Sequence, residues 1–324
     1  MPLSHAKLSV FYRQLAQQLS AGLTFAEALR APSPAPSGER QRLSALAEGG
    51  GSVTDMMAAA GSWLPQRDRP FLIAGAESGR LPLVLANLAD RHAQISTTRR
   101  RVFFASAYPL FVFHVGALIL PFVRMLDFEK GLCWSTAGYV GGLLSILVPV
   151  WGGAVLLWTL VRRGNPIAHA LLDALPAIGG YRRHQSLADF AFALGNLLEA
   201  GAPIGKAWLD AGVISRSPRL RRASERVWTH IEQGQSPGAW LGKTGAFPDD
   251  FAARYQTAER AGALDASLLA LAAEHQERAN GRLAAASMLY PGLLFAAVAA
   301  MIAYIVIGFV LKYVNTLDGL MNGL

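Results

Sequence analysis

The sequence predicts an all-helical membrane protein. Residues 102–123, 131–161 and 283–311 contain no Asp, Glu, Lys or Arg, and these stretches have 22, 31 and 29 residues. Each is longer than the roughly 20 residues that a helix needs to cross the hydrocarbon core of a bilayer. They account for the low charged fraction, 16% of 324 residues, against about 25% in soluble domains. Elsewhere the apolar residues recur every three or four positions, which is typical of amphipathic helices, and no alternating strand pattern is found.

The basic residues predict the orientation of the chain. The part before the first apolar stretch has 12 basic and 7 acidic residues, and residues 162–282 have 15 and 12. Because Lys and Arg near membrane ends stay on the cytoplasmic side, we predict three spans with the N-terminus inside and the C-terminus outside. The net charge of +8 then reflects topology and attraction to lipid headgroups, not nucleic acid binding. The arginines at the membrane ends are candidates for topology and partner docking: Arg99, Arg100, Arg101, Arg162 and Arg163.

The chain contains an internal repeat. Residues 11–22 align with residues 190–201 at an offset of 179, and both have the pattern Phe-x3-Leu-x3-Leu-x-Ala-Gly. Residues 79–92 align with residues 262–275 at an offset of 183. Two copies of one helical domain are therefore expected, each with about six helices and each followed by an apolar stretch that begins with Tyr-Pro. The shared motif positions are Gly22, Gly79, Leu81, Tyr108 and Pro109 in copy one, and Gly201, Gly262, Leu264, Tyr290 and Pro291 in copy two.

No pattern in the sequence indicates catalysis, a cofactor or a metal. The segment Gly238–Thr244 resembles a phosphate-binding loop, but three residues separate its glycines where four are needed, and no strand precedes it. The carboxylates, among them Glu77 and Glu259, have no nucleophile or histidine set beside them. We expect structural or partner-facing roles for them, and no enzyme activity.

Three further residue types need an interpretation. His92 and His275 occupy equivalent places in the two copies, and single histidines of this kind are most often residues of a polar helix face. His114 lies within the first apolar stretch, where an ionisable group is costly, so we expect it to form a hydrogen bond to another helix. Cys133 is the single cysteine and cannot form an internal disulfide.

The order of these features resembles the type II secretion F domain, found in inner-membrane platform proteins of type II secretion systems, type IV pilus machines and competence pseudopili. The resemblance rests on the shared motif positions above and on Glu259, in a Glu-x-x-Gly-x-Leu-like element of copy two. Copy one departs from it, because Ala76 stands at that place and Glu77 follows one position later. The resemblance covers nearly the whole chain.

The resemblance implies a non-catalytic platform in the bacterial inner membrane. Such a protein contacts a cytoplasmic hexameric ATPase and transmits its motion to pilins or pseudopilins, alongside other inner-membrane assembly proteins, membrane lipids and further copies of itself. Copy one and the segment Arg99–Arg101 are the first choice for docking the ATPase. A competence pseudopilus component for DNA uptake and a polytopic membrane transporter are the alternatives, and the sequence leaves the machine open.

On this basis the chain divides into seven segments. The predicted segments are a first cytoplasmic domain (1–102), a transmembrane helix (103–123), a periplasmic loop (124–137), a second transmembrane helix (138–161), a second cytoplasmic domain (162–287), a third transmembrane helix (288–311) and a periplasmic tail (312–324).

Overall fold

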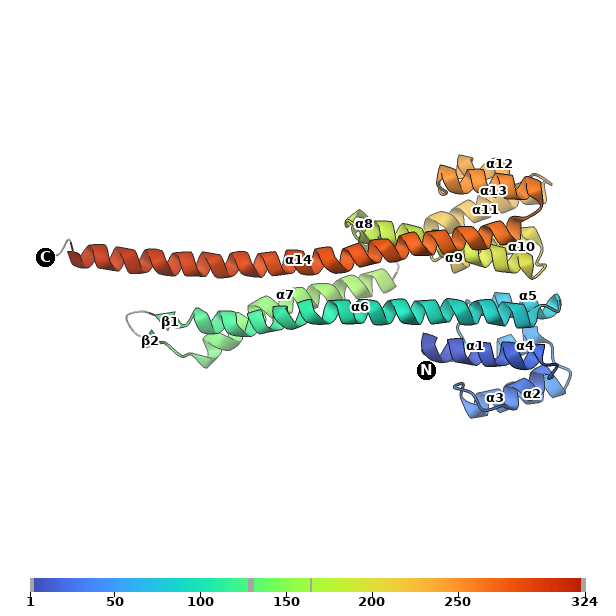
Figure 1. The fold of residues 1–324 in the computed structure, drawn as a ribbon, viewed down its shortest axis with the longest axis horizontal. Coiled ribbons are helices and arrows are strands. Elements are labelled where there is room, and N and C mark those ends of the chain that lie inside the picture. The colour runs from blue at the N-terminus through green and yellow to red at the C-terminus, as the bar shows by residue number, and fades with distance from the viewer. Residues whose placement is uncertain (1–2, 128–130, 164, 322–324) are drawn as a thin grey trace. The chain divides into compact units, whose positions relative to one another are not determined.

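The computed structural model describes residues 3–127, 131–163 and 165–321, and within them the fold is helical, as the sequence predicts (Figure 1). The first half contains five short helices and one long one. Their bounds are α1 (His5–Ser20), α2 (Phe25–Arg30), α3 (Ser37–Glu48), α4 (Val53–Ala59), α5 (Arg69–Glu77) and α6 (Leu81–Val123).

A short strand pair separates the two halves. Strand β1 (Leu126–Asp127) pairs antiparallel with β2 (Gly131–Leu132). The remaining elements are α7 (Thr136–Arg162), α8 (Pro166–Ala174), α9 (Ile178–Glu199), α10 (Ile204–Ile214), α11 (Pro218–Glu232), α12 (Gly238–Leu241), the 3-10 helix η1 (Gly242–Thr244), α13 (Asp249–Ala261) and α14 (Leu264–Met321).

The chain forms two compact units. The first unit consists of residues 1–99 and 181–280, so it contains most of both copies of the repeat, and the second consists of residues 100–180 and 281–324. Helices α6 and α14 each contribute their N-terminal part to the first unit and the remainder to the second. The sequence predicted two helical bundles but did not predict that they share one compact unit.

Local sequence signals determine where the short helices begin. Thr24 accepts a hydrogen bond from the backbone of Glu27 while the Glu27 carboxylate accepts one from Thr24, and Ser52 and Asp55 are arranged in the same way. These are the two capping boxes that the spacing of Ser or Thr before Glu or Asp predicts. Each satisfies backbone N–H groups that the first helical turn leaves without a partner.

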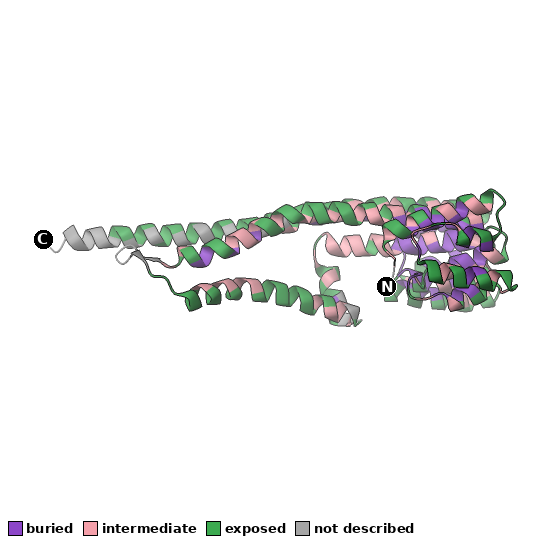
Figure 2. Ribbon diagram, turned by 90° about the horizontal axis from the view of Figure 1, so that it is seen from below, coloured by how far each residue is buried: buried purple, intermediate pink, exposed green. Residues whose placement is uncertain are grey.

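The core of the first unit is aromatic and aliphatic. Phe11 and Leu15 of α1 are buried, and the equivalent Phe190 and Leu194 of α9 are fully enclosed. Around Phe190 lies an aromatic cluster in which the ring of Trp208 is 5.2 Å from that of Phe190. Figure 2 shows the buried residues gathered on the short helices of this unit, which is where side chains exclude water. Burial of such side chains is the main stabilising contribution.

Two of the described helices have the length and composition of membrane spans. They are Leu81–Val123, with a mean hydropathy of 1.9, and Thr136–Val161, with 2.1. Their apolar side chains are mostly exposed, which is the burial pattern of a helix whose natural surroundings are lipid. The third predicted stretch lies in α14, where several side chains are outside the described residues.

Contacts between α6 and α7 bear out the prediction for His114. Trp151 Nε1 of α7 donates a hydrogen bond to His114 Nε2 of α6 over 3.3 Å, so the interhelical partner is a tryptophan. Nearby, a Cβ on Gly142 would come within 3.0 Å of Pro121. A glycine therefore permits close approach of the two helices at this level, whereas the pair Gly152–Gly153 has open space beside it.

Candidate functional site

The predicted motif glycines terminate helices, and the structure does not gather them into one site. Gly22, Gly79, Gly201 and Gly262 have φ angles of +91°, +72°, +81° and +67°. They follow α1, α5, α9 and α13, where the chain turns in the left-handed region that a Cβ disfavours. Their shared role is to set the connections in both copies of the repeat.

The other motif positions are also dispersed. Leu81 belongs to the buried core, and Leu264 packs against it. Tyr108 is 72% exposed on α6 next to Pro109, which lies inside that helix. The Tyr290 hydroxyl donates a hydrogen bond to the carbonyl of Pro176 over 2.8 Å. The side chain of Pro291 lies outside the described residues.

The candidate docking arginines are accessible where they are described. Arg99, Arg100, Arg101 and Arg163 are exposed. The guanidinium of Arg100 lies 5.7 Å from the centre of the Phe104 ring. The side chain of Arg162 is outside the described residues.

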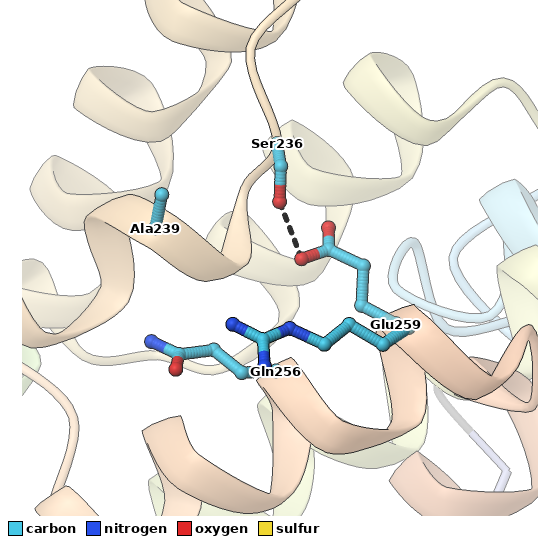
Figure 3. A pocket seen from close by; sticks show the side chains of 5 residues that line it. Ser236, Ala239, Gln256 and Glu259 are labelled. Carbon is cyan, nitrogen blue, oxygen red and sulfur yellow. Dashed lines mark hydrogen bonds between the residues drawn. The ribbon is translucent and has the colours of Figure 1, made fainter.

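Glu259 secures the start of α12. Its Oε2 accepts hydrogen bonds from the Ser236 hydroxyl, at 2.5 Å, and from the Gly238 backbone N–H, at 3.1 Å (Figure 3). Pro237, which has helical φ and ψ, is the N-cap residue of α12, and the Ser236 hydroxyl donates to Glu259 and does not cap the helix itself. Since no side-chain oxygen within the segment itself caps this turn, the carboxylate of α13 supplies that acceptor from a distant place in the sequence.

A shallow cavity of about 300 Å³ lies at this cap, lined by Ser236, Ala239, Gln256, Glu259 and Arg260 (Figure 3). The carboxylate in it already accepts two hydrogen bonds, and Gln256 donates to the Gly238 carbonyl over 2.8 Å. These groups therefore hold the chain together, and none of them is placed as a nucleophile beside a general base. Among the described residues, no group of three or more His, Cys, Asp or Glu side chains is arranged to hold a metal ion.

Copy one also has a carboxylate at the corresponding helix start, but it comes from a different position in the sequence. This explains why copy one can have Ala76 in the place of Glu259. At the start of α4, Asp55 accepts hydrogen bonds from both the hydroxyl, at 2.6 Å, and the backbone N–H of Ser52, at 3.0 Å. In copy two Ala239 stands three residues after Ser236, as Asp55 stands three residues after Ser52. Each copy thus has one carboxylate at this helix start, from within the turn in copy one and from α13 in copy two.

The prediction that His92 and His275 are residues of a polar face is wrong. Only 4% of His92 and 1% of His275 is exposed. His92 Nδ1 lies 2.6 Å from Nδ1 of His5, and His275 Nδ1 lies 3.1 Å from Nδ1 of His184. Each pair of rings is stacked at an interplanar angle of 27°. A stacked histidine pair is therefore present in both copies, between the first and the last helix.

The sequence carried a signal for these pairs that periodicity alone did not reveal. His5 and His184 are 179 residues apart, the offset of the first repeat motif, and His92 and His275 are 183 apart, the offset of the second. Comparing the two copies position by position would have shown that both have a histidine on the first helix and another on the last. In a single copy, each histidine looks isolated.

Burial makes one histidine of each pair, His5 and His275, resist protonation. It lowers the pKa of His5 from 6.5 to about 4, and the nearby His92 adds to this effect. The pKa of His275 is lowered to about 4 as well, first by burial and then by His184 and Arg278, while Asp250 and Glu274 oppose the shift. At neutral pH the imidazoles of His5 and His275 are therefore uncharged, and in each pair one Nδ1 can donate a hydrogen bond to the other.

Copy one extends its histidine pair into a buried polar chain. His92 Nε2 lies 2.9 Å from Asp68 Oδ2, and that oxygen also accepts a hydrogen bond from the Tyr12 hydroxyl at 2.7 Å. Burial and the Asp68 carboxylate raise the pKa of Tyr12 well above its usual value. In copy two Phe251 replaces Asp68 at the equivalent position and packs against the ring of His275.

A second polar cluster joins the two copies. Arg91 of α6 forms an ion pair with Asp189 of α9, and its guanidinium lies 4.2 Å from the centre of the Phe192 ring. Gln185 donates to the same carboxylate over 2.8 Å. Burial raises the pKa of Asp189, and Arg91 opposes that rise. The sequence could not reveal this pair, because an Arg and an Asp almost 100 residues apart look like solvent-exposed helix charges.

Further contacts continue along the same helix faces. Asn87 Nδ2 donates to Asn196 Oδ1 over 2.6 Å and to Glu199 Oε2 over 3.2 Å. Arg80 donates to the backbone carbonyl of Glu199. The ring of Phe71 from α5 meets that of Phe192 edge to face. The α5 and α6 side of copy one therefore packs on the α9 side of copy two.

Comparison with known proteins shows the family of this chain. A family model described as Type II secretion system (T2SS), protein F, matches residues 11–126 and again residues 190–311. The chain belongs to this family. Each matched range covers most of one copy of the repeat and most or all of the long helix into which it runs.

Two curated relatives agree with the family match. A protein named Type II secretion system protein F from Aeromonas hydrophila is 28% identical over 346 residues, covering 98% of this chain and 88% of its own length. A protein of the same name from Pseudomonas aeruginosa is 28% identical over 305 residues, covering 85% of this chain and 74% of that protein. The family predicted from the repeat and the Tyr-Pro positions is thereby confirmed.

Proposed function

We propose that this protein is an inner-membrane platform of a type II secretion system. The observation that carries the proposal is the double match of the protein F family model, once over each copy of the repeat. The relatives named for this system extend over most of the chain. Two long apolar helices are consistent with a membrane location.

The proposed topology has three spans and two cytoplasmic six-helix domains. The third span is the apolar stretch within α14, and the return crossing through α7 puts copy two on the same side as copy one. The excess of basic residues before residue 102 and after residue 161 supports a cytoplasmic N-terminus and a periplasmic C-terminus. Labelling of single cysteines introduced near each end, from either side of the membrane, tests this orientation.

The proposed mechanism is mechanical coupling. Helix α6 runs unbroken for 43 residues and α14 for 58 residues, so each extends from the helical unit into an apolar segment without a loop. A continuous helix is stiffer than a loop, so displacement at its cytoplasmic end is passed along its axis. We infer that a hexameric ATPase docks on copy one and the exposed Arg99–Arg101 segment, and that the platform passes its motion to pseudopilins and neighbouring assembly proteins.

Two experiments test these proposals separately. In a strain that lacks the gene for this protein, the wild-type chain should restore release of a type II substrate into the medium. Replacing all three arginines of the Arg99–Arg101 segment by Glu should reduce co-purification of the ATPase severalfold while the protein still inserts in the membrane. Unchanged ATPase recovery would refute the docking site, whereas failure of the wild-type chain to restore secretion would refute the platform role.

A pilus or competence role remains the second candidate, since the F domain occurs in those machines as well. The same strain decides between them. Restored twitching or DNA uptake without restored secretion would assign the protein to one of those machines. A transporter, in contrast, would move a solute when purified without partners.

A further inference from the structure

Helix α8, which connects α7 to α9 (Figure 1), exposes apolar side chains along one side. Ile167 is 77% exposed and Leu171 is 54% exposed, and because they are four residues apart, both lie on one face of the helix. Ala170 and Ala174 are exposed next to them. Ala168, about a quarter turn away, is buried. One side of α8 therefore packs on the protein, and another presents an apolar stripe to its surroundings.

Local sequence signals form α8 and fix its connection to α9. The Asn165 side chain accepts hydrogen bonds from two backbone N–H groups of the first turn, and Pro166 follows it as the first helical residue. At the other end, the Gly179 N–H donates to the carbonyl of Leu175 over 3.0 Å, and a Cβ on Gly179 would overlap the carbonyl oxygen of Asp173. The turn is therefore tight, and it holds α8 at a defined place beside the start of α9.

The N-terminal end of α8 lies close to a membrane boundary. Helix α7 ends at Arg162 and α8 begins at Pro166, so the four peptide units between them span about 14 Å at most. Trp158 is exposed one turn before the end of α7, and tryptophan and arginine at the end of an apolar helix mark the level of the lipid headgroups. The inference rests on the proposed topology here, in which α7 is a span that ends at the cytoplasmic surface.

The C-terminal end of α8 lies at a second membrane boundary. Two residues after the helix ends, the carbonyl of Pro176 accepts a hydrogen bond from the Tyr290 hydroxyl over 2.8 Å. Tyr290 lies near the start of the third predicted span, 288–311, and tyrosine is enriched at the membrane surface. A Cβ on Gly180 would meet the side chain of Arg282 at 3.3 Å, and Arg282 is the last charged residue before that span. Both ends of α8 are therefore held near the level of the bilayer surface.

A lipid surface is the occupant that this placement favours for the apolar stripe. The second compact unit includes residues 100–180, so α8 groups with the apolar helices, although the sequence predicted it within the cytoplasmic domain 162–287. The boundary between headgroups and acyl chains offers the apolar contact that Ile167 and Leu171 lack within the chain. Arg163, exposed just before α8, would meet the anionic headgroups.

We propose that α8 is an in-plane membrane helix. It lies on the cytoplasmic surface of the bilayer, with Ile167 and Leu171 in the boundary between headgroups and acyl chains. Helices of this kind bury their apolar face about 5–10 Å into that boundary. Copy two is thereby attached to the bilayer at α8 as well as at α14, and its first helix, α9, starts at a fixed height above the membrane.

Spin-label accessibility tests the proposal on the full chain, purified in a Cys133→Ser background and placed in lipid nanodiscs without partner proteins. Ile167→Cys and Leu171→Cys carry the label on α8, and Val148→Cys, at an exposed position midway along α7, marks the bilayer interior. Val213→Cys on α10 is the matched control, because this apolar residue of copy two is 60% exposed. The measurement is the ratio of accessibility to oxygen over accessibility to a water-soluble nickel complex, which rises with depth in a bilayer. The two α8 labels should give a ratio severalfold above the Val213 label and below the Val148 label.

The outcomes separate this proposal from the topology on which it rests. A ratio at Leu171 equal to that at Val213, with a high ratio at Val148, would overturn the in-plane helix and leave the α7 span intact. A low ratio at Val148 would refute the topology and the proposal together. A ratio at Leu171 as high as that at Val148, or one that rises only when partner proteins are added, would also overturn the proposal.

A charge on the stripe gives an independent measurement. In Leu171→Asp, the carboxylate favours water over the acyl boundary, so the ratio at a label on Ile167→Cys should fall severalfold, whereas Leu171→Phe should preserve it. The ratio at Val148→Cys should be the same in both variants, which checks that the chain still folds and inserts. If the ratio at position 167 is unchanged by Leu171→Asp, the stripe does not contact lipid and the proposal is wrong.

Discussion

Removing the Glu259 carboxylate should open the start of α12, and moving a carboxylate into the turn should close it again. In Glu259→Ala, the Ser236 hydroxyl and the Gly238 N–H lose the acceptor that they share at 2.5 and 3.1 Å. A hydrogen bond to a charged group contributes about 1.5–3 kcal/mol when buried. Because this site is half-buried, we expect a loss of about 2 kcal/mol for the two bonds together, or about 30-fold in the local opening equilibrium.

Copy one supplies the design for the rescue. Its Asp55 caps α4 from within the turn, three residues after Ser52, and in copy two Ala239 stands three residues after Ser236. The double variant Glu259→Ala with Ala239→Asp should therefore recover most of the lost protection. In the reverse direction, Ala76→Glu should rescue Asp55→Ala, because the carboxylate then comes from α5 as it does from α13 in copy two.

Hydrogen exchange of the full chain in detergent is the measurement, read by mass spectrometry on peptides that cover residues 236–244. The single variant should exchange about 30 times faster there, while peptides from α1 should be unchanged. If the double variant exchanges as fast as the single one, the carboxylate does not act as a helix cap. If Glu259→Ala leaves the exchange rate unchanged, the two hydrogen bonds contribute nothing to the fold.

Three further predictions concern His275, Asp189 and Gly201. Between pH 7 and pH 5 the protein should lose about 2 kcal/mol of its free energy of unfolding through His275, because the unfolded histidine takes up a proton near pH 6.5 and the folded residue, with a pKa of about 4, does not. In His275→Asn the thermal midpoint should therefore fall less steeply as the pH is lowered. An unchanged dependence of the midpoint on pH would contradict this. Asp189→Ala should lower the free energy of unfolding by about 3 kcal/mol, because it leaves Arg91 buried without its partner. The double variant Asp189→Leu with Arg91→Met should lower it by less, as measured by denaturant unfolding. Equal losses in the two variants would argue against a buried pair. Gly201→Ala should lower the free energy of unfolding by about 1 kcal/mol because of the glycine's φ of +81° alone. The new Cβ would meet only Ser78, at 3.6 Å, which is an ordinary contact. An unchanged thermal midpoint would contradict the requirement for a left-handed backbone at this position.

The sequence predicted features that depend on neighbours along the chain. The capping boxes at Thr24 and Ser52 formed as their spacing predicts, because the groups involved are three residues apart. The helix-ending glycines Gly22 and Gly201 have positive φ for the same local reason. The need of His114 for an interhelical partner also followed from its apolar surroundings, although Trp151 as that partner did not.

The features that the sequence did not reveal depend on groups that are far apart in the chain. His92 was expected on a polar face because its partner His5 lies 87 residues away and no local pattern links them. The role of Glu259 required knowing that α13 passes beside the start of α12. The contacts of Asp55 then explained why copy one has no carboxylate at the position of Glu259.

The sequence by itself determined the helical class, the apolar stretches, the repeat and, through the repeat, the family. Those properties follow from composition and periodicity, which burial and the bilayer impose on each segment separately. The tertiary structure alone decided that the last helix of copy one packs on the first helix of copy two, with Arg91 on Asp189. Residues on solvated and on packed helix faces have the same spacing in the chain, so only the packing itself distinguishes a face that is covered from one that faces solvent.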